Sequence, residues 1–137
     1  MSASAIIREL LANHAPLTAI VAPAKIRVGN IPQDLTKQLP AIGVRPVSSN
    51  ENWTTARNLK NKMIRERVQV TVFANDFITM ERALKAASLG RGVHTGVVKG
   101  FRVCSILPES TNPYFGPADD NIHEQSRDFM VTFIEAN

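Results

Sequence analysis

Apolar and polar side chains alternate most regularly between positions 67 and 74, where valine stands at 68, 70 and 72 and alanine at 74. This period of two predicts a strand with one buried face. Asp76 can then cap a helix. Four apolar residues recur along that helix at three- and four-residue spacing: Phe77, Met80, Leu84 and Ala87. Gly90 is placed to end it. A strand followed by an amphipathic helix of about four turns predicts a helix packed on a sheet.

The segment before this centre predicts one helix and two strands. Isoleucine at 6 and 7 and leucine at 10 and 11 form a narrow apolar stripe, which predicts a helix that Ser2 or Ser4 can cap and Pro16 ends. Residues 17–21 can add one short helical turn or a docked loop. Residues 25–28 and 41–48 are predicted strands. Pro46 indicates a strand end or a sheet edge, because proline has no N–H to donate.

The C-terminal part predicts a hairpin and a long last strand. Lys99-Gly100 is typical of a two-residue hairpin turn, between Val97-Val98 and a strand over 101–107 that Pro108 is expected to stop. Within that strand, Cys104 is expected to share a face with Arg102 and Ile106. Residues 123–135 predict the last strand, with phenylalanine, valine and phenylalanine at 129, 131 and 133 on one face.

These elements predict a single domain over residues 1–137 with an α+β fold, a mostly antiparallel β-sheet with helices packed on one face. A chain of this length can bury about two-thirds of its unfolded surface without disulfides. Two polar segments, 48–62 and 110–120, are predicted to be long connections, which are usually functional or disordered.

Several short motifs occur in a characteristic order. The longest is the alternating strand, polar break and Ala-rich helix from Arg67 to Gly90. The others are Leu10-Leu11-Ala12, Pro16 to Val21, Ile26-Arg27-Val28, Ile31-Pro32-Gln33, Leu39-Pro40-Ala41 and Ser126-Arg127-Asp128-Phe129. Together they resemble the tail terminator, or tail completion, proteins of long-tailed bacteriophages. The chain departs from that pattern at Phe73, where tryptophan is more frequent, and at 110–122, which is longer than usual.

The resemblance implies a structural virion protein that forms a ring, typically six-fold, caps the tail tube and supplies the surface that joins tail to head. The implied partners are other copies of the chain, the tail tube protein and the head–tail connector, and a contractile sheath remains open as a further partner. DNA would only pass through the lumen. The implied location is the neck end of the virion tail, after assembly in the host cytoplasm.

Composition limits the alternatives. The chain is 44% hydrophobic and 20% charged, which is ordinary for a globular protein. No apolar run approaches the ~18 residues of a membrane span and no signal peptide is evident, so no membrane partner is expected. Cys104 is the single cysteine, which excludes an internal disulfide and a multi-cysteine metal site.

Charge is distributed unevenly. Residues 57–67 hold five basic residues and one acidic residue, whereas residues 109–135 hold six acidic residues and one basic residue. Both segments can simply be solvated, or they can meet within one subunit or between neighbours. The net charge of +4 also permits a small nucleic-acid-binding protein, the alternative function, although no recognition module is visible.

The candidate interface lies mainly in the polar connections. Trp53 is an aromatic anchor among polar and basic residues, so we expect the 48–62 loop to be mobile in the free subunit and ordered in the tail. The candidate partner-binding residues are Trp53, Arg57, Leu59, Lys60, Lys62, Arg65, Arg67, Tyr114, Phe115, Asp119 and Asp120.

No set of residues predicts catalysis. The glycine-rich run from Gly90 to Gly96 precedes a strand, so it lacks the helix N-terminus that holds a phosphate. His14, His94 and His123 have no metal-ligand spacing, and Asp119-Asp120 with Glu124 does not form a calcium loop. We therefore expect no enzymatic activity, no metal and no cofactor.

Overall fold

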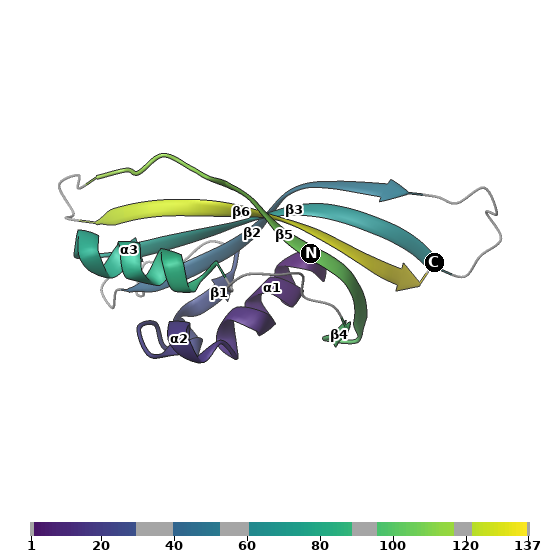
Figure 1. The fold of residues 1–137 in the computed structure, drawn as a ribbon, viewed down its shortest axis with the longest axis horizontal. Coiled ribbons are helices and arrows are strands. Elements are labelled where there is room, and N and C mark those ends of the chain that lie inside the picture. Colours follow the sequence, from purple (N-terminus) through teal and green to yellow (C-terminus); the bar gives the residue numbers. More distant parts are fainter. Residues whose placement is uncertain (1, 30–39, 53–60, 89–95, 117–121, 137) are drawn as a thin grey trace.

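One sheet with helices on a single face makes up the described part of the chain, which in this computed structural model comprises residues 2–29, 40–52, 61–88, 96–116 and 122–136 (Figure 1). The strands are, in spatial order, β1 (Ile26–Val28), β2 (Ala41–Asn52), β3 (Asn61–Ala74), β6 (His123–Ala136), β5 (Phe101–Thr111) and β4 (Gly96–Val98). β1 pairs with β2 in parallel and the other neighbours are antiparallel. The predicted α+β fold with a mostly antiparallel sheet is confirmed.

The helices lie together below the sheet in the view of Figure 1: α1 (Ser2–Ala12), α2 (Ala15–Thr18) and α3 (Phe77–Ala86). A 3-10 turn over Pro23–Lys25 leads into β1. The prediction that Pro16 ends the first helix was wrong. α1 already ends at Ala12, and Pro16 lies in the first turn of α2, where a missing N–H costs no helical hydrogen bond.

The buried face of β3 is the one that the alternation predicted. Its three valines and Ala74 have no solvent exposure, and Phe129, Val131 and Phe133 of β6 lie buried beside them. Met80 and Leu84 of α3 cover this face, which confirms the strand–helix unit. Phe77 differs from the prediction, since it begins the helix and is 42% exposed.

α1 is held at its start by a carboxylate from the sheet. Glu66 is buried on the same face as Val68, and the Ala3 backbone N–H donates to its Oε2 at 3.3 Å. The first N–H groups of a helix have no partner within the helix, so Glu66 supplies one from outside. The prediction that Ser2 or Ser4 caps α1 was wrong, because the helix already includes Ser2 as its first residue and Ser4 lies buried within it.

Three strands extend beyond the bounds that the sequence predicted. β2 continues to Asn52 and β3 starts at Asn61, so both ends of the predicted 48–62 connection are strand. β5 likewise continues through Pro108. Pro46 and Pro108 are tolerated because each pairs on one side only, beyond the last residue paired to β1 or β4, and each adjoins a register shift.

Another register shift, within β5, changes which residues of that strand face the core. It falls between Val103 and Ser105, so Val103 and Ile106 are both buried. The prediction that Cys104 shares the face of Ile106 was therefore wrong. The predicted hairpin turn is confirmed, since Lys99 and Gly100 both have positive φ, at 52° and 81°, as the turn type that suits the twist of paired strands requires.

Candidate functional site

The second face of the sheet carries no helix in the described part of the chain (Figure 1). We call it the open face; it is the side on which Gln69, Thr71 and Phe73 of β3 lie. Strand register places Gln69 between Arg45 and Asp128, and Thr71 between Gly43 and Ser126. An antiparallel sheet can leave one face to water, but it also offers a partner a broad, ordered surface.

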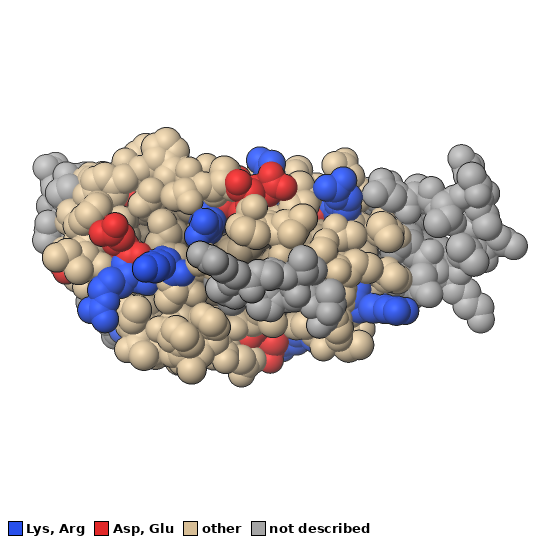
Figure 2. Space-filling model, in the orientation of Figure 1, with Lys and Arg blue, Asp and Glu red and all other residues tan. Residues whose placement is uncertain are grey.

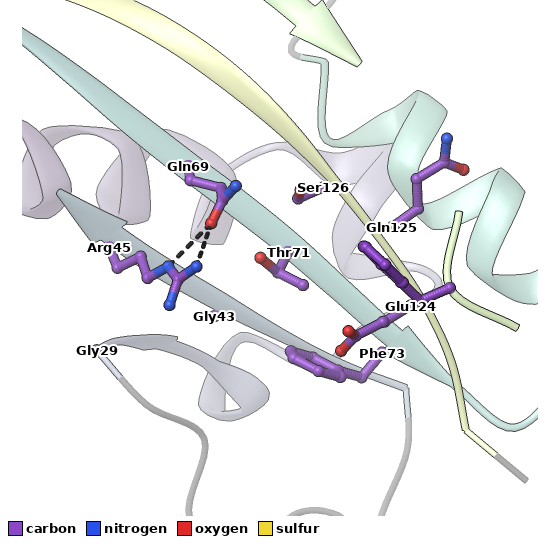
Figure 3. A pocket seen from close by; sticks show the side chains of 10 residues that line it. Gly29, Gly43, Arg45, Gln69, Thr71, Phe73, Glu124, Gln125 and Ser126 are labelled. Carbon is purple, nitrogen blue, oxygen red and sulfur yellow. Dashed lines mark hydrogen bonds between the residues drawn. The ribbon is translucent and has the colours of Figure 1, made fainter. Parts of the chain in front are cut away.

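A hollow of about 250 Å³ lies on the open face and is shown in Figure 3. It is lined by Gly29, Gly43, Arg45, Gln69, Thr71, Phe73, Phe115, Glu124, Gln125 and Ser126. We call it the open-face hollow. Gly43 has no side chain, and those of Thr71 and Ser126 are short. The middle of the hollow is therefore open, and longer side chains lie at its two ends.

Arg45 forms the positive end of the open-face hollow. Its Nε and Nη2 donate to Gln69 Oε1 at 2.9 and 2.7 Å, which fixes the guanidinium over the sheet (Figure 3). Arg45 is exposed and forms no ion pair with any described residue. A guanidinium has five N–H donors, so the remaining ones can bind a carboxylate from a partner.

Glu124 and two aromatic rings form the opposite end. The side chain of Glu124 is half-buried and has no hydrogen bond or ion pair with the residues that the structure describes. Phe115 is 60% exposed, and its backbone pairs with that of Glu124 at 2.9 and 3.0 Å. With Phe73 beside it, this end combines one negative charge with exposed aromatic surface.

Arg67 joins the positive and negative segments of the sequence within one subunit. Its guanidinium lies 3.6 Å from Glu109 and 3.6 Å from Asp128. Asn112 donates to Asp128 Oδ1 at 3.0 Å and to Ser126 Oγ at 2.9 Å, which fixes the chain after β5 against β6. Of the two ways in which the charged segments could meet, the one within a subunit therefore occurs at this point.

Tyr114 packs the chain that follows β5 onto α3. Its ring meets Phe77 edge-on at 5.1 Å and stacks on His123 at 5.8 Å, and its hydroxyl hydrogen-bonds His123 Nδ1. Phe77 therefore packs against Tyr114 and not into the core beneath α3. The rings of Phe77, Tyr114 and His123 form an aromatic cluster at one end of the sheet.

The other predicted interface residues are distributed as follows. Arg65 is exposed on the open face, two residues from Arg67 along β3. Lys62 is the second residue of β3 and pairs with Glu135 of β6. Six of the predicted residues lie outside the described part of the chain: Trp53, Arg57, Leu59, Lys60, Asp119 and Asp120. The predicted interaction loop is thus untested. The prediction that Gly90 ends the helix after β3 was wrong, because α3 already ends at Ala86 with Ala87 as its C-cap residue.

The sequence did not single out Arg45, Gln69 or Glu124 as a group. They come from three strands, and only the register between those strands places them around one hollow. The alternation along β3 did place Gln69 on the polar face. The register itself does not follow from any local pattern of residues.

Among the described residues, no group of three or more His, Cys, Asp or Glu side chains could hold a metal ion. None of the described helices is long and apolar enough to cross a membrane.

Comparison with known proteins finds similarity at the level of the fold. No protein-family model matches it, and no curated protein matches it. Among solved structures it is similar to a chain of the virion of a native gene transfer agent (GTA) particle, with a TM-score of 0.75 and 14% sequence identity. The match covers 96% of this chain and 94% of the other. At this identity, the two chains share a fold.

Proposed function

We propose that this chain is a structural protein of a phage-like virion. The observation that carries the proposal is the fold shared with a chain of a GTA virion over 96% of this chain, at a TM-score of 0.75. Because the match spans nearly all of both chains, it concerns the whole fold and not a common motif. The short motifs that resemble tail terminators are an independent, sequence-level argument for the same class.

The specific role proposed is that of a tail terminator. In this role copies of the chain form a ring, typically six-fold, that caps the tail tube and presents the surface for joining the head. Its partners are other copies of itself, the tail tube protein and the head–tail connector, and its location is the neck end of the tail. The role is non-catalytic and requires complementary surfaces.

Two surfaces of the subunit support self-assembly. The open face carries a hollow with one positive and one negative end, and the opposite face of the sheet carries the helices. Different surfaces on opposite sides suit a head-to-tail contact, which closes into a ring when each step includes the right rotation.

Electron microscopy of the purified protein at several concentrations tests this function. We expect discrete rings with a central opening, in numbers that grow with concentration. Particles of single-subunit size at every concentration, both alone and after addition of tail tubes, would overturn the tail-terminator role.

Nucleic-acid binding remains the second candidate because the chain has a net charge of +4. On the face shown in Figure 2, however, Lys and Arg side chains form small separate groups with Asp and Glu between them, and no continuous basic stripe is seen. Phosphate-driven binding weakens steeply with salt. Salt-dependent binding of a short labelled duplex at micromolar protein, measured by fluorescence anisotropy, would favour this candidate.

A further inference from the structure

Most of the carboxylates that the structure describes already have a hydrogen-bond or ion-pair partner. Among those whose side chains the structure describes, Glu9, Glu66, Asp76, Glu109 and Asp128 each accept a hydrogen bond or form an ion pair. Glu81 and Glu124 have no such partner among the described residues. These two carboxylates lie on opposite faces of the sheet, Glu81 on α3 and Glu124 in the open-face hollow.

Glu81 belongs to an exposed stripe of α3. Ile78, Glu81, Arg82 and Lys85 are all exposed, and their spacing of three, four and seven residues places them on one side of the helix. Ile78 is 62% exposed, which is unusual for a large apolar residue on an otherwise amphipathic helix. We call these four residues the outer stripe of α3. It offers one acidic, two basic and one apolar side chain. None of the three charged side chains forms an ion pair with a described residue.

The open-face hollow offers the complementary set. Within the described part of the chain, Arg45 at one end has an oriented guanidinium without a carboxylate partner, and Glu124 at the other end has a carboxylate without a cationic partner. The exposed Phe115 and the half-buried Phe73 supply aromatic surface beside Glu124. Each charged group of the hollow therefore finds its opposite on the outer stripe, and Ile78 can cover the aromatic rings.

We propose that the open-face hollow binds the outer stripe of α3 of a second copy of this chain. Arg45 pairs with Glu81 of the neighbouring copy, while Glu124 pairs with Arg82 or Lys85 of that copy. The contact joins two different surfaces, so it is head-to-tail and can build a ring. The inference rests on the proposed ring and names the surfaces that form it.

Charge reversals at the two sides of the contact test the inference. Arg45→Glu and Glu81→Arg are each expected to raise the concentration needed for half-assembly about tenfold or more, since each places like charges together. The double variant R45E/E81R is expected to restore assembly. Arg102→Glu is the matched control, because it makes the same charge change at an exposed arginine of β5 outside the hollow. It is expected to assemble like the parent.

Mixing the two single variants gives a sharper test. In an equimolar mixture, the reversed hollow of one variant meets the reversed helix of the other, and the two unaltered surfaces also meet. An alternating ring can then close if its number of copies is even. Assembly restored in the mixture and in the double variant supports the proposal, with analytical ultracentrifugation as the readout and circular dichroism showing that each variant is folded.

Other outcomes decide against the proposal. Single variants that assemble like the parent would overturn this contact and leave the ring intact, as would single variants that neither the double change nor mixing rescues. A parent chain that forms no ring, either alone or after addition of tail tubes, overturns the tail-terminator role as well. Should a reversal unfold the chain, Arg45→Gln and Glu81→Gln remove the charges and are expected to shift assembly in the same direction; no shift would overturn the contact.

Discussion

Val70 illustrates how strictly the sheet separates its two faces. It has no solvent exposure, and its β3 neighbour Gln69 lies half-buried on the open face. An unpaired carboxylate at position 70 would lie in an apolar core, at a cost that exceeds the stability of most domains. We expect Val70→Asp to prevent folding and Gln69→Ala to fold, as measured by circular dichroism. A V70D chain that melts like the parent would contradict the assignment of the faces.

Leu84 tests the packing of α3 on the sheet. It is only 7% exposed, so Leu84→Ala leaves a cavity that the surrounding side chains fill incompletely. We expect a loss of about 2 to 5 kcal/mol in the free energy of unfolding, measured with urea. Ile78→Ala, on the exposed side of the same helix, should stay within about 0.5 kcal/mol of the parent under conditions that keep the chain monomeric. Equal losses for the two variants would contradict this packing.

Glu66 shows a side-chain role that charge counting misses. In the sequence it is one acid among five bases, whereas in the structure it is 4% exposed and accepts the Ala3 N–H. We expect Glu66→Ala to cost about 1 to 3 kcal/mol, because it leaves a buried donor without its acceptor. Glu66→Gln keeps an acceptor oxygen and should cost less. The order of the two variants in urea unfolding checks this, and the reverse order would refute it.

The start of α3 depends on one capping side chain. Asp76 accepts hydrogen bonds from the Thr79 backbone N–H at 3.3 Å and from its hydroxyl at 3.2 Å, as the sequence predicted for a cap. Asp76→Ala is expected to cost about 0.5 to 2 kcal/mol. Asp76→Ser can accept the same backbone bond and should retain most of the stability. An Asp76→Ala variant whose thermal melt coincides with that of the parent would show that the cap contributes nothing.

Elements with a regular hydrophobic period could be predicted from the sequence. Which other elements pair with them in space could not. The β3–α3 unit follows from its alternation and helical spacing, which depend only on local sequence. The effect of Pro46 and Pro108 instead depends on whether a strand pairs on that side, and topology decides this. For the same reason, both strands continue beyond their predicted ends.

The candidate site was predictable only in part. Tyr114 and Phe115 were recognised as aromatic residues in a polar segment, and Phe115 does line the open-face hollow. Arg45 and Glu124 carry no local signal, because their meaning depends on the register between strands far apart in sequence. Whether a carboxylate has a partner is likewise a property of the folded chain, since only there do Glu81 and Glu124 differ from the other described carboxylates.

The whole molecule has two unlike surfaces with complementary charge. One is the open face with its hollow, and the other is the helical layer with the outer stripe of α3. Contacts of this kind use exposed charges, which salt screens: the Debye length falls from about 10 Å at 0.1 M to about 3 Å at 1 M. An assembly built from them should therefore weaken as the salt concentration rises.

The mass of the purified protein at two salt concentrations tests the central claim, that this chain assembles into a ring, most directly. At low salt and high protein concentration we expect one discrete species, with a mass about six times the 15.1 kDa of the chain. Raising the salt toward about 1 M should shift it toward single subunits. A mass of 15.1 kDa at low salt and at every protein concentration would contradict self-assembly of the free chain.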